Sequence, residues 1–203
     1  MGKRDRVRVE AAVGGLLGFA AMAWLMATGQ AIRFDLPVRA AIHARAFPAL
    51  TVAMRLITTL GTGYFLVPLA VVLIWRWVRR GERRSAYLLA AGSLSAQAAS
   101  DILKTLFHRL RPEVFFGLAP AETYSFPSGH AFVPEVYFWL LASLLAAGPQ
   151  GRAAVILLAA LLGFSRVYLG YHYPSDVLAG WALAVFWAAV WTAIADRLAP
   201  PRP

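Results

Sequence analysis

The sequence predicts an all-α polytopic membrane protein with six transmembrane helices and an interfacial amphipathic helical segment between the first and second. Three observations carry this prediction. Hydrophobic residues make up 60% of the 203 residues and charged residues only 15%, whereas soluble domains have roughly 45–50% and 25%. The mean hydropathy is +0.60. Six apolar stretches approach the roughly 20 residues that a helix needs to cross a bilayer.

The predicted spans follow one another along the chain, separated by charged or turn-forming residues. The first follows a basic tail, residues 1–8, and runs for about twenty residues without a clear small-x-small cleavage site. We therefore expect a retained span rather than a signal peptide. The six spans are predicted at residues 9–28, 63–78, 85–107, 130–147, 152–167 and 175–195.

Residues 30–62 interleave charged side chains with apolar ones at helical spacing. This pattern is typical of an amphipathic segment that lies in the membrane interface, here on the extracytoplasmic side. An ordinary extramembrane helical hairpin would give the same pattern, and the sequence leaves both interpretations open. No internal repeat or linker is evident, so residues 1–203 are expected to form a single integral membrane domain.

The cations predict the orientation of the chain. The net charge is +10, from 20 Lys+Arg against 10 Asp+Glu. With the N-terminus in the cytoplasm, twelve cations lie on the cytoplasmic side and eight outside, and a dense block at residues 76–84 occupies a short cytoplasmic loop. We therefore expect both termini in the cytoplasm. Nucleic-acid binding is disfavoured because it needs an exposed basic stripe on a soluble fold.

Most reactive side chains lie in three segments at the predicted outer ends of the spans, residues 104–112, 127–130 and 165–176. Ionisable groups at membrane depth are costly and are functional candidates by default. Lys104, Arg111 and Arg166 have few acidic neighbours, which disfavours a purely structural ion-pair network. Clustered cations instead favour an anion, and guanidinium groups suit phosphate because they donate two parallel hydrogen bonds.

The second segment opens the fourth predicted span with Ser128, Gly129 and His130. The free N–H groups of a helix N-terminus attract anions. Gly129 allows the backbone to approach a ligand closely, and the Ser128 hydroxyl can donate to that ligand or cap the helix. The start of this helix is therefore expected to complete an anion site.

His172 and Asp176 lie four residues apart around Pro174, which suits the first turn of a helix. The carboxylate can hold one imidazole nitrogen as a donor and leave the other as a nucleophile. His130 is available as the general acid. These residues predict phosphoryl transfer through a phosphohistidine, with cations in place of a metal. No cofactor is expected, because the chain has no cysteine and no carboxylate cluster suited to magnesium.

The three segments resemble the signature of the type-2 phosphatidic acid phosphatase superfamily, K-x6-R-P, P-S-G-H and S-R-x5-H-x3-D. All three are complete and in order between residues 104 and 176. The resemblance implies His172 as nucleophile, Asp176 as its partner and His130 as acid. It also implies phosphate binding by Lys104, Arg111, Arg166, Ser128 and Gly129, with Pro112, Pro127 and Ser165 as supporting positions.

Several neighbouring residues have other expected roles. Asp101 is expected to orient Lys104, because side chains three residues apart on a helix face each other. Arg109 is either a lipid headgroup contact or a solvated loop residue. The chain departs from the family after P-S-G-H, where Pro134 is expected to kink or shorten the span. Glu135 is expected to contact an arginine or to shape the substrate pocket.

The resemblance implies a metal-independent lipid phosphatase in a membrane, and the inner membrane of a bacterium is the expected location. The predicted topology puts its site on the extracytoplasmic face. Expected substrates are a polyprenyl pyrophosphate such as undecaprenyl pyrophosphate, or a glycerophospholipid phosphate such as phosphatidylglycerol phosphate or phosphatidic acid. A phosphotransferase with a lipid acceptor and a non-catalytic lipid-phosphate carrier are the alternatives. Vanadate-dependent haloperoxidases share the signature but are soluble. The sequence indicates no oligomeric state.

Overall fold

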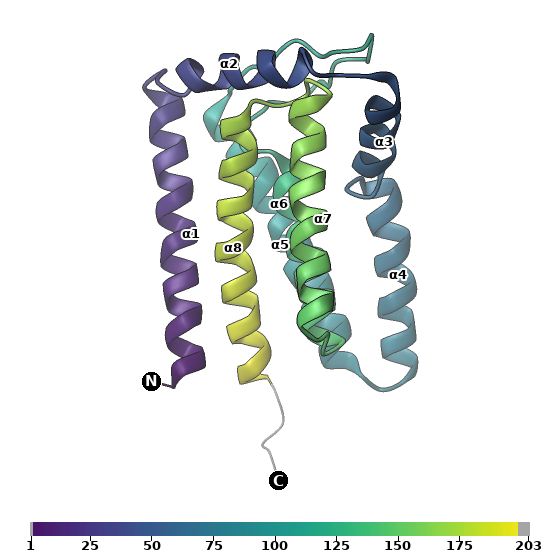
Figure 1. Ribbon diagram of the computed structural model, residues 1–203. Helices are drawn as coiled ribbons and strands as arrows, with labels where there is room; N and C mark the ends of the chain where they lie inside the picture. Colours follow the sequence, from purple (N-terminus) through teal and green to yellow (C-terminus); the bar gives the residue numbers. More distant parts are fainter. Residues whose placement is uncertain (1, 199–203) are drawn as a thin grey trace.

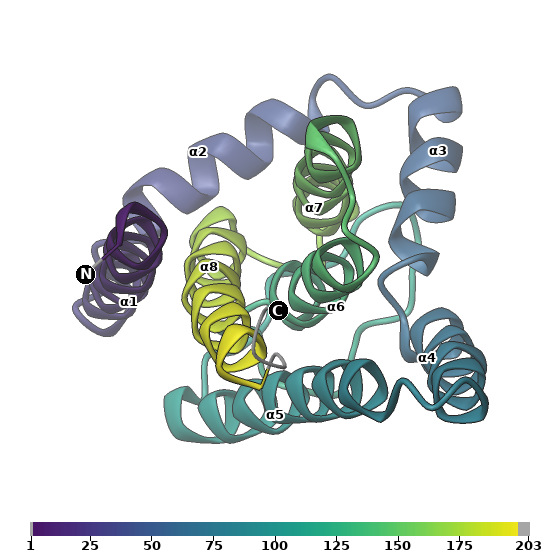
Figure 2. The ribbon, with the colours of Figure 1, turned by 90° about the horizontal axis from the view of Figure 1, so that it is seen from below.

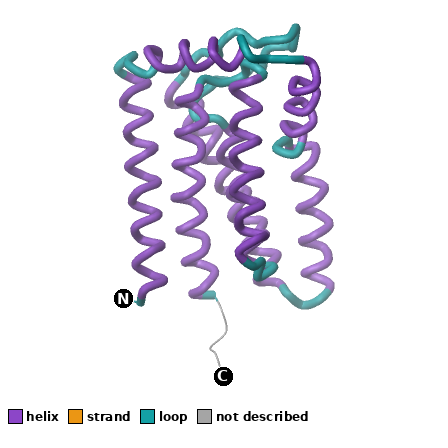
Figure 3. The backbone as a smooth tube through the Cα atoms, viewed as in Figure 1, coloured by secondary structure: helices purple, strands orange, loops and turns teal. Residues whose placement is uncertain are grey.

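The computed structural model describes residues 2–198, which form eight α-helices and no strand (Figures 1 and 3). This confirms the all-α prediction for the described part of the chain. Six helices overlap the six predicted spans and run between the two ends of the bundle. They are α1 (Lys3–Ala27), α4 (Gly63–Arg79), α5 (Arg83–Phe107), α6 (Gly129–Leu144), α7 (Pro149–Tyr168) and α8 (Pro174–Arg197). Helix α5 runs at a slant to its neighbours (Figure 2).

Residues 30–62 form two further helices at one end of this bundle. Helix α2 (Ile32–His43) lies across the ends of α1, α7 and α8 (Figure 1). Helix α3 (Pro48–Thr59) precedes α4 and meets it at a bend of 41°. The Tyr168 hydroxyl of α7 lies 2.8 Å from the Thr51 hydroxyl and fastens α3 to the bundle.

Three helices are long and apolar enough to cross a membrane within the described residues, and the bent pair of α3 and α4 is a fourth candidate. The three helical segments are Asp5–Ala27, Pro149–Tyr168 and Pro174–Arg197. Helix α6 has only 16 residues, and α5 carries Gln97, Asp101 and Lys104. Length and composition therefore support an integral membrane protein without establishing all six predicted spans.

Close approach of small residues joins α1 to α8. A Cβ atom at Gly15 would lie 2.6 Å from the Ala182 carbonyl oxygen and 2.8 Å from the Phe186 nitrogen. Small residues allow such backbone contact between membrane helices. Arg8 and Asp196 form an ion pair at 2.6 Å, so the start of α1 and the end of α8 lie at the same end of the bundle.

Helix α6 lies at the centre, between α5, α7 and α8 (Figure 2). Phe132 and Val136 on this helix are fully buried. Gly180 lets α8 reach the start of α6, because a Cβ atom there would lie 2.7 Å from the Ser128 carbonyl oxygen. This contact brings the beginning of α6 and the first turns of α8 together.

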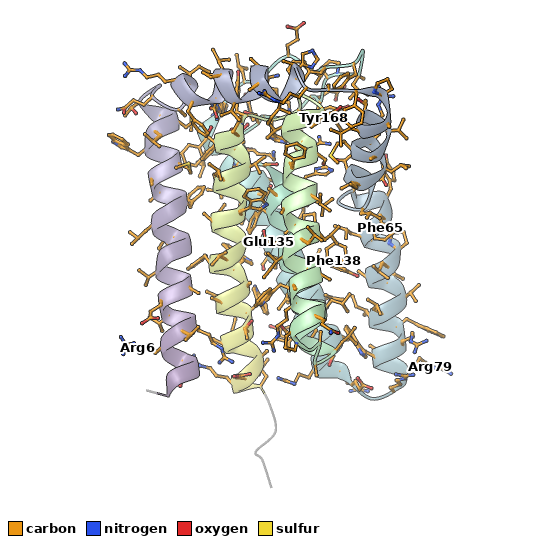
Figure 4. The ribbon with its side chains drawn as sticks, in the orientation of Figure 1. Arg6, Phe65, Arg79, Glu135, Phe138 and Tyr168 are labelled. Carbon is orange, nitrogen blue, oxygen red and sulfur yellow. The ribbon has the colours of Figure 1, made fainter. Side chains whose placement is uncertain are left out.

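Pro134 and Glu135 both lie within α6. The helix continues through Pro134 and ends at Leu144, before the end of the predicted span at residue 147. Glu135 lies about halfway along the bundle (Figure 4), and its Oε2 atom has no hydrogen-bond partner among the described residues. Among the described residues this atom therefore lacks the arginine contact that was expected for Glu135.

Candidate active site

The three sequence segments meet at the end of the bundle that α2 covers. Lys104 lies in the last turn of α5 and Arg166 in the last turn of α7. Gly129 begins α6 after Ser128 as N-cap, and Pro174 begins α8 with Asp176 in its first turn. Helix ends from four parts of the chain thus converge on one place.

His172 lies in the loop before α8 and is 1% exposed. Its Nδ1 atom lies 3.4 Å from Asp176 Oδ2, and its Nε2 atom lies 3.1 Å from Arg111 Nη1. A guanidinium can only donate, so Nε2 is the accepting nitrogen and Nδ1 carries the proton. The lone pair of Nε2 therefore faces the cations.

The surroundings keep His172 neutral. Burial lowers the pKa of His172 well below its usual range, and Arg111, Lys104 and Arg166 lower it further. A neutral imidazole has the free electron pair that nucleophilic attack requires.

Asp176 is fully buried and is held from two directions. Its Oδ2 atom accepts a hydrogen bond from the Tyr173 amide at 2.9 Å. Its backbone carbonyl accepts from the Ser128 amide at 3.0 Å, which ties the start of α8 to the start of α6. The carboxylate that faces His172 is thus fixed by the helix cap itself.

Each of the three cations is positioned by neutral groups. Arg111 donates to the Thr123 carbonyl at 2.6 Å and to the Tyr171 carbonyl at 2.9 Å. Lys104 donates to the Tyr124 carbonyl at 3.1 Å. Because these partners carry no charge, the cations keep their positive charge available for an anion.

Arg166 is placed by α3 as well as by its own helix. Its Nη1 atom donates to the Thr58 hydroxyl at 2.9 Å, and its guanidinium lies 4.1 Å from the centre of the Tyr171 ring. Its Nε atom is buried and has no hydrogen-bond partner within residues 2–198. The guanidinium is therefore held in place while part of its donor capacity is unused.

Several other buried polar atoms around the same point have no hydrogen-bond partner among the described residues. They include Ser100 Oγ, Ser128 Oγ and His130 Nε2. Buried polar atoms are normally hydrogen-bonded, so this group suits a polar ligand. Gly129 leaves the space open, since a Cβ atom there would lie 3.2 Å from Ser100 Oγ.

These residues form one end of a cavity of about 570 Å³. The polar end contains the three cations, His130 and His172. From there the cavity extends between α4, α5 and α6, along mostly apolar side chains. Its apolar wall includes Leu66, Val67, Ala70, Val71, Ile74, Leu89, Leu94 and Val133. The cavity therefore suits an amphiphile with an anionic head.

The supporting residues have structural contacts. The Ser165 hydroxyl donates to the Leu162 carbonyl at 2.6 Å within α7, and Pro112 and Pro127 are buried. The expected role of Asp101 in orienting Lys104 is wrong: its carboxylate instead accepts from the Gln97 amide at 3.0 and 2.9 Å.

The sequence interpretation missed Arg109 and Asp35. Arg109 is neither solvated nor directed to a headgroup, because its side chain is 11% exposed and forms ion pairs with Asp35 and Asp176. Its proximity in sequence to Arg111 was the available signal. Asp35 lies in the amphipathic segment, far from the three motifs in the sequence, and gave no signal of a site.

The fold and the site together define a membrane protein that is helical over its described residues and has a histidine-containing pocket with a cationic end and an apolar wall. Residues 85–199 match the sequence model of the PAP2 superfamily. The chain belongs to the PAP2 superfamily, which confirms the resemblance seen in the three segments.

Relatives and a solved structure agree with this membership. The chain is 31% identical over 146 residues to phosphatidylglycerophosphatase B of Bacillus subtilis, covering 68% of this chain and 71% of that protein. It is 29% identical over 160 residues to an undecaprenyl-diphosphatase of Sulfolobus acidocaldarius, covering 76% and 75%. A crystal structure of a transmembrane PAP2 type phosphatidylglycerolphosphate phosphatase from Bacillus subtilis matches with a TM-score of 0.85, at 26% identity, over 94% of this chain and 98% of that one.

Proposed function

We propose that this chain is a membrane lipid phosphatase that works through a phosphohistidine at His172. The observation that carries the proposal is a single cavity with cations and two histidines at one end and an apolar wall along the rest. Such a cavity fits a phosphate joined to a hydrocarbon chain. The names of the relatives, a phosphatidylglycerophosphatase and an undecaprenyl-diphosphatase, support the same class of reaction.

In the first step, Lys104, Arg111 and Arg166 hold the phosphoryl oxygens. The bound phosphate takes over the Arg111 donor that lies against His172 Nε2, which frees the lone pair. Nε2 then attacks phosphorus, and the bond between phosphorus and the leaving oxygen breaks. Charge stabilisation by preorganised donors is the main source of rate enhancement in such a step.

His130 is proposed to give a proton to the leaving oxygen. The anionic phosphoryl group beside it favours the protonated imidazole. In the second step, water attacks the phosphohistidine, His130 takes back a proton, and the bond between Nε2 and phosphorus breaks to release phosphate. Asp176 accepts from His172 Nδ1 throughout and stabilises the cationic imidazole.

We propose six membrane spans, with both termini in the cytoplasm and the site on the extracytoplasmic face. The arginine block at the turn between α4 and α5 supports this orientation, because it lies at the end opposite the site. Arg79 of that block and Arg6 of α1 both lie at this end (Figure 4). Cation-rich short loops favour the cytoplasm. Polar residues of the site explain why α5 is less apolar than an ordinary span.

Among lipid phosphates, we propose a glycerophospholipid phosphate as the preferred substrate. The buried hydroxyls of Ser93, Ser100 and Tyr137 line the cavity and have no hydrogen-bond partner among the described residues. Ser100 lies one helical turn from Lys104, and Ser93 lies three turns from it. The ester groups of a glycerolipid could accept from these hydroxyls, whereas a polyprenyl chain offers only hydrocarbon.

The test is phosphate release by the purified protein in detergent, with and without a chelator. The substrates are phosphatidylglycerol phosphate, phosphatidic acid and undecaprenyl pyrophosphate. We expect turnover that the chelator leaves unchanged, higher kcat/KM for the glycerolipids, and none in His172→Ala. The control is His108→Ala, whose imidazole is exposed in the loop after α5. Turnover in His172→Ala would contradict the mechanism.

The same assay separates the two alternatives. Labelled phosphate that appears in an added lipid acceptor, rather than in solution, indicates a phosphotransferase. Binding of every substrate without any turnover indicates a carrier. A higher kcat/KM for undecaprenyl pyrophosphate than for the glycerolipids would contradict the substrate preference but leave the phosphatase proposal intact.

A further inference from the structure

A second charged cluster lies directly behind His172 and Asp176. The Arg109 Nη1 atom lies 2.5 Å from Asp176 Oδ1, and its Nη2 atom lies 2.6 Å from Asp35 Oδ2. The two carboxylates therefore share one guanidinium. Asp35, Arg109, Asp176 and His172 form a continuous chain of contacts that begins on α2 and ends at the proposed nucleophile.

Asp35 is bound at both of its oxygens. It is fully buried, and it accepts from the Ser175 amide at 2.9 Å and from the Ser175 hydroxyl at 2.6 Å. The same hydroxyl accepts from Arg109 Nη1 at 2.7 Å. Ser175 is the residue immediately before Asp176, so Asp35 fixes both the charge partner and the backbone neighbour of that aspartate.

The charges of this cluster do not cancel. A buried carboxylate is strongly destabilising unless it is paired, and Arg109 supplies the partner of Asp176. A single Arg–Asp pair would be neutral, however, and would offer little to a positive charge on His172. Asp35 adds a second negative charge, so the three side chains in direct contact, Asp35, Arg109 and Asp176, carry one excess negative charge. Arg39 is the next cation, and among the described residues it forms no ion pair with either carboxylate.

That excess charge matches the charge that the reaction creates. Attack by Nε2 turns the neutral imidazole of His172 into a phosphorylated, cationic ring whose Nδ1–H points at Asp176. A net negative cluster stabilises this form more than the neutral one. The stabilisation therefore acts on the transition state and the intermediate and not on the bound substrate, which is what raises kcat.

We propose that Asp35 and Arg109 are positioning residues for the proposed phosphatase reaction: they hold Asp176 toward His172 and keep the cluster negative. This inference rests on the proposed function. A purely structural tie between α2 and the rest of the protein is already supplied one turn further along α2. There Arg39 donates to the Glu113 carbonyl at 2.6 Å, and its guanidinium lies 4.7 Å from the Phe115 ring centre.

The test compares two phosphate-like ligands in the Asp35→Asn variant. Inorganic phosphate binds as the product, whereas vanadate can bond to the imidazole and take the five-coordinate geometry of the transition state. We expect kcat and vanadate affinity to fall by about 10- to 100-fold, as when an outer partner of a metal-bound histidine is removed. Phosphate affinity and KM should remain at the wild-type value.

The matched control is Arg39→Lys, which weakens the attachment of α2 but keeps the charge. It should lower the unfolding temperature without changing the ratio of vanadate to phosphate affinity. Asp35→Glu restores the charge and should recover part of the lost vanadate affinity. In an Arg109→Gln background the effect of Asp35→Asn should differ from its effect in the wild type, because side chains of one contact network are not additive.

The inference is overturned if Asp35→Asn weakens vanadate and phosphate equally, or changes neither. Both affinities are measured by thermal shift of the purified protein and need no turnover. If the wild-type protein releases no phosphate from any lipid but the vanadate ratio still depends on Asp35, the proposed function fails and the positioning cluster stands. If turnover is normal and the ratio is unchanged, the cluster fails and the phosphatase stands.

Discussion

The Nη1 atom of Arg111 lies 3.1 Å from the Nε2 atom of His172. The same guanidinium is held from the other side by the Thr123 hydroxyl, 2.9 Å from its Nη2 atom. Arg111 thus occupies the lone pair of the proposed nucleophile. In the proposed mechanism, substrate binding and activation of the histidine are then one event, because a phosphoryl group that engages Arg111 also releases Nε2.

Arg111→Lys should therefore lower kcat/KM strongly although it keeps the positive charge. A lysine is a point charge that cannot hold Thr123, Tyr171 and a phosphoryl oxygen together. We expect a loss of about 10²- to 10³-fold, the range seen when one donor to a transition-state anion is removed. The control is Arg45→Lys in the turn after α2, whose guanidinium has the Ala41 carbonyl as its one hydrogen-bond partner within the described residues. Equal activity in the two variants would contradict the role of Arg111.

The acidic limit of activity should report His172. Burial, together with Arg111, Lys104 and Arg166, lowers the pKa of this imidazole well below its usual range. Protonation removes the Nε2 lone pair and should therefore lower kcat/KM, which reflects the free enzyme. Because the pKa is lowered, kcat/KM should stay constant as the pH falls past about 6.5, the usual histidine pKa, and should decrease only at a more acidic pH. Lys104→Gln removes one cation, raises the pKa of His172 and should move the fall to higher pH. The measurement is kcat/KM as a function of pH for the wild-type protein and for Lys104→Gln on the same substrate. If kcat/KM falls at the same acidic pH in both proteins, the assignment to His172 is wrong.

Gly180→Ala should damage both stability and activity. The added methyl group would lie 2.7 Å from the Ser128 carbonyl and 2.9 Å from the Ala131 Cβ atom, which pushes α8 away from the start of α6. Such overpacking costs about 1–3 kcal/mol. Gly14→Ala is the matched control, because no atom lies within 4 Å of a Cβ there and alanine favours the helix by about 1 kcal/mol. Unfolding temperature and kcat measure the two effects; an unchanged Gly180→Ala protein would refute this account of the contact.

The proposed orientation can be tested with single cysteines, because the chain has none of its own. Ala119→Cys places a thiol in the exposed loop beside the site, and Glu82→Cys places one in the turn between α4 and α5. A membrane-impermeant thiol reagent added to intact cells should label the first and not the second. After permeabilisation it should label both. The reverse pattern would place the site in the cytoplasm.

Much of the helical framework could be predicted because its signals are local. Apolar length predicted where each long helix would lie, and Pro174 marked the start of α8, where the structure begins it. Ser128 likewise precedes the first residue of α6. Caps and prolines act within one turn, so a linear sequence contains all the information that they need.

Contacts between distant segments could not be predicted in this way. Asp35 and Arg109 are 74 positions apart, and no spacing rule joins an aspartate in an amphipathic segment to an arginine in a loop. Asp101 shows the opposite difficulty. Its position allowed contact with Lys104 on one side or Gln97 on the other, and Lys104 turned instead to the Tyr124 carbonyl. Local rules state which contacts are possible, but competition among partners selects one of them.

The position of Asp35 has a practical consequence for protein engineering. The family match covers residues 85–199, yet α2 supplies a fully buried charge to the group that faces His172. A hybrid that joined those residues to a foreign N-terminal half would need an acidic side chain at the position of Asp35. Without one, Arg109 would pair with Asp176 alone, and the charge beside the site would differ from that of this protein. Donor sequences for such hybrids should therefore be chosen by the residue that meets Arg109.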